Sequence, residues 1–160
     1  YAGEAEYDTI AAVKQAVSIP VVANGDIDGP RKAKFVLDVT GADAVMVGRA
    51  AQGRPWIFRE IVAYLNDGHE IAPPTVAEAK AVLLAHLQHH YEFYGALTGV
   101  RTARKHIGWY VTPLHGGEAF RRHMNRLDSC AEQLQAVSEF MDELAQMHTF
   151  LPYILEKDAV

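Results

Sequence analysis

The sequence predicts an α/β fold at the start of the chain and an all-helical region after it. Short continuous apolar runs at residues 19–23 and 44–47 are typical of strands that are buried on both faces of a parallel sheet. The stretch between them has a helical pattern, so the order and length are those of one βαβ unit. After residue 74 the patterns are helical only. The composition, with 49% hydrophobic and 22% charged residues, is that of an ordinary globular protein.

The first helix is expected over residues 8–17. Asp8 or Thr9 stands at its start and can accept hydrogen bonds from the free N–H groups of the first turn. The first apolar run follows this helix and ends abruptly at Asn24 and Gly25, so the strand is expected to stop there.

Proline at the start and glycine at the end mark the second and third helices. Asp28 is expected to cap the second helix, and Pro30 lies in its first turn, where a missing N–H loses no hydrogen bond. Gly41 is expected to end this helix, because glycine readily adopts the left-handed conformation of a helix terminus. Pro55 is expected to open the third helix, which Gly68 closes.

A linker with two consecutive prolines, Pro73 and Pro74, separates the α/β pattern from the helical pattern. We therefore expect an α/β segment at 1–70, a helical domain at 71–147 and an unassigned tail at 148–160. Two capping boxes mark helix starts in the helical part, because in each a hydroxyl residue precedes a glutamate by three positions. These boxes are Thr75–Glu78 and Ser129–Glu132, and the expected helices span 75–94, 98–111, 117–127 and 129–147.

Small and polar residues follow both predicted strands. Asn24, Gly25 and Asp26 come after the first strand, and Gly48 and Arg49 come after the second. The carboxyl ends of parallel strands meet at one edge, which is where alternating barrels hold their ligands. Glycine lets a ligand approach the backbone, free N–H groups at a helix start bind phosphate, and arginine adds a cation. The pair of loops predicts a phosphate site, against the alternative of two tight turns without a ligand.

Longer strings around these residues resemble the tRNA-dihydrouridine synthases. The most distinctive is Gly-Arg-Ala-Ala-Gln-Gly-Arg-Pro-Trp-Ile-Phe at residues 48–58, and two later strings resemble the bacterial B-type branch. The resemblance covers about residues 1–146. The strings that carry it are 3–8, 19–27, 40–58, 93–95 and 101–110.

The resemblance implies an FMN enzyme with a TIM (β/α)8 barrel followed by a small helical domain. Such enzymes reduce the 5,6 double bond of particular uridines in tRNA, and NADPH or NADH reduces the flavin. The chain is then expected to be the C-terminal part of the enzyme, with segment 1–70 from the FMN-binding barrel and 71–147 as the tRNA-binding domain. By the same resemblance, the expected FMN-binding residues are Asn24, Gly25, Asp26, Gly48 and Arg49.

The resemblance also implies that this chain contains no catalytic residue. The proton-donating cysteine of the family lies upstream of the matched segment, and Cys130 at the start of the last helix is not expected to replace it. The fragment alone is therefore expected to be inactive. One cysteine excludes an intrachain disulfide, so we expect a reducing cytoplasm. We expect the full-length enzyme to act as a monomer. No apolar run approaches the roughly 20 residues needed to cross a membrane, so we expect no membrane partner.

Basic residues are concentrated in residues 93–126, which contain six lysines and arginines and one acid, in a chain with a net charge of −5. Cations on a helix face bind RNA phosphates without reading sequence. Gly108 lies on the same expected face and would allow close approach, whereas the alternative is a solvated charged surface. The expected RNA-binding residues are Arg101, Arg104, Lys105, Arg121 and Arg122.

Two other functions remain open at the level of sequence. One is an RNA-binding fragment without catalysis, and the other is an FMN-barrel oxidoreductase that acts on a small pyrimidine. The second predicts no basic helical domain. His86, His89 and His90 share a helix face, but no cysteine or carboxylate joins them at a known ligand spacing, so no metal site is expected.

Overall fold

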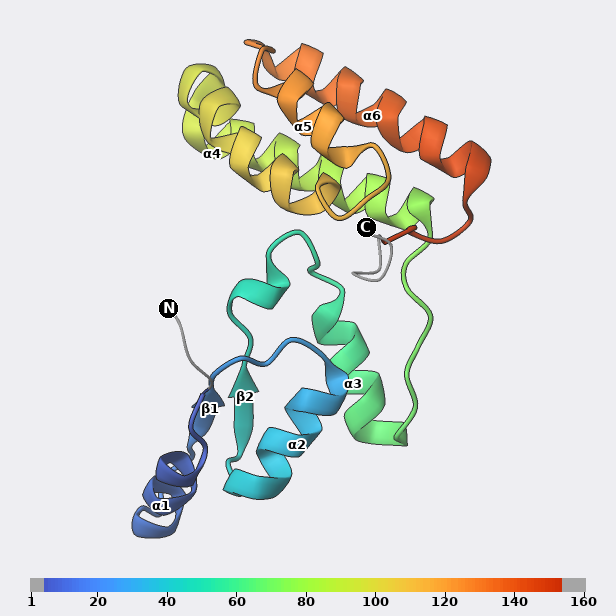
Figure 1. Ribbon diagram of the computed structural model, residues 1–160. Coiled ribbons are helices and arrows are strands. Elements are labelled where there is room, and N and C mark those ends of the chain that lie inside the picture. Colours follow the sequence, from blue (N-terminus) through green and yellow to red (C-terminus); the bar gives the residue numbers. More distant parts are fainter. Residues whose placement is uncertain (1–4, 154–160) are drawn as a thin grey trace. The chain divides into compact units, whose positions relative to one another are not determined.

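The computed structural model describes residues 5–153, and the chain divides into two compact units, Tyr1–Ala72 and Pro73–Val160 (Figure 1). The first unit contains helices and a small sheet, whereas helices dominate the second. Within the described residues, no helix combines the length and the apolar character needed to cross a bilayer. The elements of the first unit are α1 (Asp8–Ala16), β1 (Val22–Asn24), α2 (Pro30–Thr40), β2 (Ala44–Met46), η1 (Arg49–Ala51) and α3 (Ile57–Asp67).

Strands β1 and β2 pair in parallel, and α2 connects them as the βαβ prediction requires (Figure 1). Val22 lies opposite Ala44, and Asn24 lies opposite Met46, so the two strands end side by side. The core beside the sheet is apolar, because α2 and α3 each contribute a buried face. Its buried members are Ala23, Ile27, Ala33, Val36, Ala42, Ile57 and Ile61.

The expectation that both faces of these strands are buried is wrong for the described residues. Ala23 is fully buried, but Val22 is 57% exposed and Met46 is 54% exposed. Side chains alternate along a strand, so the residues beside Ala23 point away from the core. A continuous apolar run therefore leaves apolar side chains on the other face of this sheet.

Helix ends in the first unit follow the glycine and proline signals. Pro30 lies at the start of α2, and Gly41 ends that helix with a φ of 65° while its N–H donates to the carbonyl of Leu37. Gly68 ends α3 in the same way, with a φ of 72°. The left-handed conformation at these two positions favours glycine because it has no Cβ.

The side-chain caps predicted for α1 and α2 are wrong. Tyr7, not Asp8 or Thr9, occupies the N-cap position of α1, and Glu6 accepts a hydrogen bond from the N–H of Thr9 at 2.8 Å. Gly29 occupies the N-cap of α2 without a side-chain hydrogen bond, so Asp28 does not cap that helix.

The third helix begins later than the sequence predicts. Pro55 was expected to open it, but α3 begins at Ile57, after η1 and a turn. Trp56 takes the N-cap position. Ile57 is fully buried, which anchors the first turn of α3 in the core.

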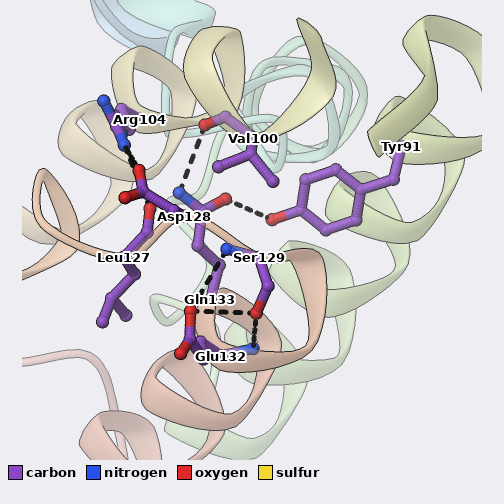
Figure 2. Close-up of polar contacts among 8 residues, drawn as sticks. All are labelled: Tyr91, Val100, Arg104, Leu127, Asp128, Ser129, Glu132 and Gln133. Atoms are coloured by element: carbon purple, nitrogen blue, oxygen red, sulfur yellow. Dashed lines mark hydrogen bonds and ion pairs between the residues drawn. The ribbon is translucent and has the colours of Figure 1, made fainter. Parts of the chain in front are cut away.

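The second unit consists of α4 (Val76–Val111), α5 (Gly117–Met124) and α6 (Cys130–Met147). Both predicted capping boxes are confirmed. The Thr75 hydroxyl accepts from the N–H of Glu78 at 3.1 Å, and the Glu78 carboxylate accepts from the N–H of Thr75 at 2.8 Å. Ser129 and Glu132 make the corresponding pair at the start of α6 (Figure 2).

Helix α4 is bent back on itself at Gly95, whose φ of 72° and ψ of 170° are not helical. The two helices predicted at 75–94 and 98–111 are confirmed as the two halves of α4, which fold against each other as a tight hairpin (Figure 1). Gly99 allows the halves to approach, because a Cβ at that position would lie 3.3 Å from the Cα of Tyr91. His90 and Thr102 join the halves through a 2.7 Å side-chain contact.

A buried glutamine links both halves of α4 to α6 (Figure 2). The Tyr91 hydroxyl donates to the side-chain oxygen of Gln133 at 2.7 Å, and the side-chain nitrogen of Gln133 donates to the carbonyl of Val100 at 3.2 Å. Gln133 is fully buried, so these bonds satisfy a polar group that would otherwise destabilise the core. Burial also raises the pKa of Tyr91 far above its ordinary value.

Part of the unassigned tail packs against the start of α4. Thr75 and Phe150 form an antiparallel bridge, and the N–H of Leu151 donates to the carbonyl of Pro74 at 3.1 Å. Leu151 is buried. The rest of the tail, after residue 153, lies outside the described residues.

Candidate functional site

The loops that follow β1 and β2 contact each other through the predicted site residues. The guanidinium of Arg49 lies 3.2 Å from the carboxylate of Asp26, and the side-chain nitrogen of Asn24 donates to the carbonyl of Met46 at 2.9 Å. The register of the sheet brings this about, because Asn24 pairs with Met46 at the carboxyl ends of the strands.

The first loop has a strained backbone with a local structural cause. Gly25 has a φ of 148° and Asp26 a φ of 43°, both in the region that favours glycine. A Cβ on Gly25 would lie 2.5 Å from the Cβ of Ala5. The Tyr7 hydroxyl donates to the carbonyl of Gly25 at 2.8 Å, and the N–H of Ala5 donates to Asp26 at 2.9 Å. Asp26 thus joins the segment before α1 to Arg49, and one side of Gly25 faces protein.

The second loop is open. A Cβ on Gly48 would meet no atom within 4 Å, and the Arg49 side chain is 75% exposed. Gly48 precedes η1, whose first N–H groups have no carbonyl within their own turn to donate to. Amide donors, an exposed guanidinium and space beside the backbone are the features that a phosphate group requires.

Arg54 and Glu60 support these loops, although the sequence analysis assigned them no role. Arg54 donates to the carbonyl of Asp28 at 3.1 Å and forms an ion pair with Glu60 in α3. Glu60 is only 8% exposed. Its position was a usable signal, because Glu60 lies on the same helix face as the buried Ile57 and Ile61, where a carboxylate needs a partner. Arg54 therefore ties the loop after β2 to the loop after β1.

The basic residues of the helical unit have different surroundings. Arg101 and Lys105 are exposed, and the Lys105 ammonium lies 4.9 Å from the centre of the Trp109 ring. Arg121 binds Glu118 at 2.8 Å, and Arg122 lies 3.7 Å from the same carboxylate. This pairing with Arg121 lowers the pKa of Glu118 below its ordinary value.

Arg104 holds the connection between α5 and α6 (Figure 2). Its guanidinium donates to the carbonyl of Leu127 at 3.0 Å and to the carboxylate of Asp128 at 2.8 Å. These bonds engage the Arg104 guanidinium with the connection between α5 and α6. Gly108 was expected to admit a close partner, but it is buried, and a Cβ there would lie 3.3 Å from the Cδ of Arg121. The element that approaches Gly108 is α5.

Three histidines form a cluster between the halves of α4. The ring centres of His86 and His106 are 5.1 Å apart, and those of His90 and His106 are 5.0 Å apart. The sequence analysis grouped His89 with His86 and His90, but His89 is exposed. It missed His106 because this residue belongs to the second half of α4. Burial lowers the pKa of all three clustered rings, and their mutual repulsion lowers those of His86 and His106 further. Among residues 5–153 no group of three or more histidine, cysteine or acidic residues is arranged to hold a metal ion.

The geometry is that of a βαβ unit with a candidate phosphate site at the strand ends, followed in the chain by a helical unit that contains the basic segment 93–126. Comparison with known proteins assigns the family: residues 1–146 match the family described as Dihydrouridine synthase (Dus), and the chain belongs to it.

Curated relatives carry the name tRNA-dihydrouridine synthase B. The protein of Shewanella oneidensis is 58% identical over 146 residues, which is 91% of this chain and 45% of the relative. The proteins of Escherichia coli K12 and Pseudomonas aeruginosa are each 54% identical over 143 residues, 89% of this chain and 44% and 43% of the relatives. The chain thus spans less than half the length of the relatives it matches.

Proposed function

We propose that the chain is the C-terminal portion of an FMN-dependent oxidoreductase that reduces the 5,6 double bond of specific uridines in tRNA, with NADPH or NADH as the reductant. Membership of the Dus family and the name of the curated relatives, tRNA-dihydrouridine synthase B, support this function. The observation that carries it is the meeting of the two strand-end loops through Asp26 and Arg49. In this proposal the βαβ unit is part of a TIM barrel, and its exposed apolar strand residues face the remaining strands.

The strand-end loops would hold the phosphate of FMN. The open space at Gly48 admits a phosphate to the backbone amides, and Arg49 supplies a cation. Asp26 would orient Arg49 rather than face the anion, and Asn24 would hold the two strand ends together. When bound, FMN supplies the hydride transfer, and the residues of this chain bind and orient its phosphate end.

The helical unit would bind tRNA. Arg101, Lys105, Arg121 and Arg122 would contact phosphates, which gives affinity without sequence selection. Arg104 was included in this set from the sequence, and we now assign it to the connection between α5 and α6 because of its bonds there. Cys130 opens α6 in the helical unit, and we assign it no part in proton donation.

Substitution of Arg49 tests the phosphate site. Arg49→Ala removes a charge-assisted contact, so we expect FMN affinity to fall roughly 10- to 100-fold. Arg31→Ala is the matched control, because Arg31 is an exposed arginine of the same unit that pairs with Glu70 at 2.6 Å. The FMN affinity of both variants is measured by fluorescence titration of the full-length gene product. Equal affinity of Arg49→Ala and wild type would contradict the site.

The reaction itself is tested with unmodified tRNA, NADPH and FMN, and with mass spectrometry of the digested RNA. Dihydrouridine in the product supports the proposal. Reduction of a free pyrimidine with unchanged tRNA would favour the small-molecule alternative, and tRNA binding without reduction would favour the non-catalytic alternative. The fragment of residues 1–160 by itself is expected to be inactive in this assay.

A further inference from the structure

Three large apolar side chains are exposed together at the bend of α4. Phe93 is 80% exposed, Leu97 is 71% exposed and Tyr94 is 49% exposed, on either side of Gly95. We call these three residues the kink patch. Exposed aromatic and aliphatic side chains scattered singly are ordinary, but a group of them at one end of a helical hairpin indicates a contact with a partner.

The rings of the patch belong to a longer row of aromatic contacts. Phe93 and Tyr94 have ring centres 4.8 Å apart, and Tyr94 and His90 have ring centres 4.7 Å apart. The row continues from His90 to His106 and on to Trp109, at 5.0 Å for each step. Because Thr102 contacts the His90 ring at 2.7 Å, Tyr94 rests on a ring that is itself held in place. The two rings of the patch are therefore held against the helix before any partner binds.

Cations flank the patch on the second half of α4. Arg101 follows Leu97 by one helical turn, and Lys105 follows Arg101 by another, so the three share one side of the helix. Arg101 and Lys105 are exposed, and within residues 5–153 neither forms an ion pair. Glu92, next to Phe93, is the acid nearest in sequence. Flat exposed rings beside cations that no carboxylate of the described residues neutralises fit a polyanion with aromatic bases better than they fit an apolar protein surface.

We propose that the kink patch stacks against an unpaired base of tRNA while Arg101 and Lys105 bind the neighbouring phosphates. This inference rests on the proposed function, because it names the contact through which the helical unit holds its RNA. Stacking is available to every base, since each has a π face, so the patch would add affinity for single-stranded regions without choosing a sequence.

The test compares ring and non-ring side chains at Phe93. The affinity of the full-length gene product for tRNA is measured by fluorescence anisotropy over a series of salt concentrations. We expect Phe93→Ala and Phe93→Leu each to weaken binding roughly tenfold and Phe93→Trp to retain it, because base stacking requires a ring. Met147→Ala is the matched control, a 64% exposed apolar side chain of the same unit, and it should leave affinity unchanged.

The salt dependence separates stacking from charge. Phe93→Ala should leave the slope of affinity against salt concentration as it is in the wild type, whereas the double variant Arg101→Ala, Lys105→Ala should make it shallower. A fully paired RNA duplex should bind the wild type and Phe93→Ala equally. Circular dichroism of each variant confirms that the helices remain folded, which the exposure of Phe93 leads us to expect.

The measurements distinguish failure of the proposed function from failure of the stacking inference. If the wild type does not bind tRNA, the proposed function fails. If the wild type binds and Phe93→Ala binds equally well, only the stacking inference is overturned. If Phe93→Leu behaves as Phe93→Trp, or if Phe93→Ala changes the mass in sedimentation but not the RNA affinity, the patch is an apolar protein interface and the inference is also overturned.

Discussion

At the scale of single residues, local signals were predictable and tertiary partners were not. Thr75 and Ser129 cap their helices as expected, because a capping box lies entirely within four consecutive residues. Asp28 looked like an equally good cap, yet its carbonyl accepts from Arg54 and the chain enters α2 through Gly29. Arg104 looked like a free cation in the sequence, and its partner Asp128 lies 24 positions away.

The buried hydrogen bond of Tyr91 gives a prediction at this scale. Tyr91→Phe removes the donor to Gln133 and leaves a buried amide oxygen without its partner, so the free energy of unfolding should fall by about 1–3 kcal/mol. Chemical denaturation followed by circular dichroism measures the change. Tyr94→Phe is the control, because its ring is half exposed, and its stability should be unchanged. Equal stability of the two variants would mean that water or another donor replaces the Tyr91 hydroxyl.

At the scale of elements, the sequence predicted where helices occur better than how they meet. Residues 76–111 carry a helical pattern on both sides of Gly95, and two helices were expected there. The hairpin depends on contacts such as His90 with Thr102 and on the absence of a side chain at Gly99. Those contacts join residues on different helical halves, which a periodic pattern along one helix does not specify.

Substitution of Gly95 tests the origin of the bend. Its φ of 72° and ψ of 170° lie in a region that essentially only glycine adopts. Gly95→Ala should therefore lower the free energy of unfolding by roughly 1–3 kcal/mol. Gly29→Ala is the matched control, because its backbone is extended and a Cβ there would meet no atom within 4 Å. A loss of stability for Gly29→Ala as large as that for Gly95→Ala would refute the backbone explanation.

At the scale of the whole molecule, the fold class was predictable and the burial of the sheet was not. An apolar run without alternation correctly indicated parallel strands, and β1 and β2 do pair in parallel. Whether Val22 and Met46 are covered depends on which other strands and helices surround the sheet, and this information is not contained in the run itself. The two strand-end loops were predictable for the same reason as the pairing, because strand order alone places them together.

The two tryptophans, Trp56 and Trp109, lie in different units and can report pH effects on each. Burial lowers the pKa of His86, His90 and His106, so these imidazoles are neutral in the folded helical unit at pH values where they bind protons when unfolded. The unfolded state therefore takes up more protons below a pH of about 6.5, and stability falls as the pH is lowered.

The midpoint of denaturation reported by Trp109 in a Trp56→Phe variant should accordingly decrease between pH 7.5 and pH 5. His106→Asn should flatten this dependence, since it removes one titrating ring. The same scan with Trp56 in a Trp109→Phe variant is the comparison, and a smaller shift is expected there. A Trp109 midpoint that does not change with pH would show that the clustered histidines are as accessible to protons in the folded unit as in the unfolded chain.

The short bridge between Thr75 and Phe150 places the residue before α4 next to the segment that follows α6. A protein segment whose two ends are neighbours can be inserted into a loop of another protein without stretching that loop. Joining Phe150 to Thr75 with a few residues and opening the chain elsewhere, for example beside the exposed His115 before α5, should yield a circular permutant with the same helices, which circular dichroism would measure. The helical unit thus has the geometry of a transferable module.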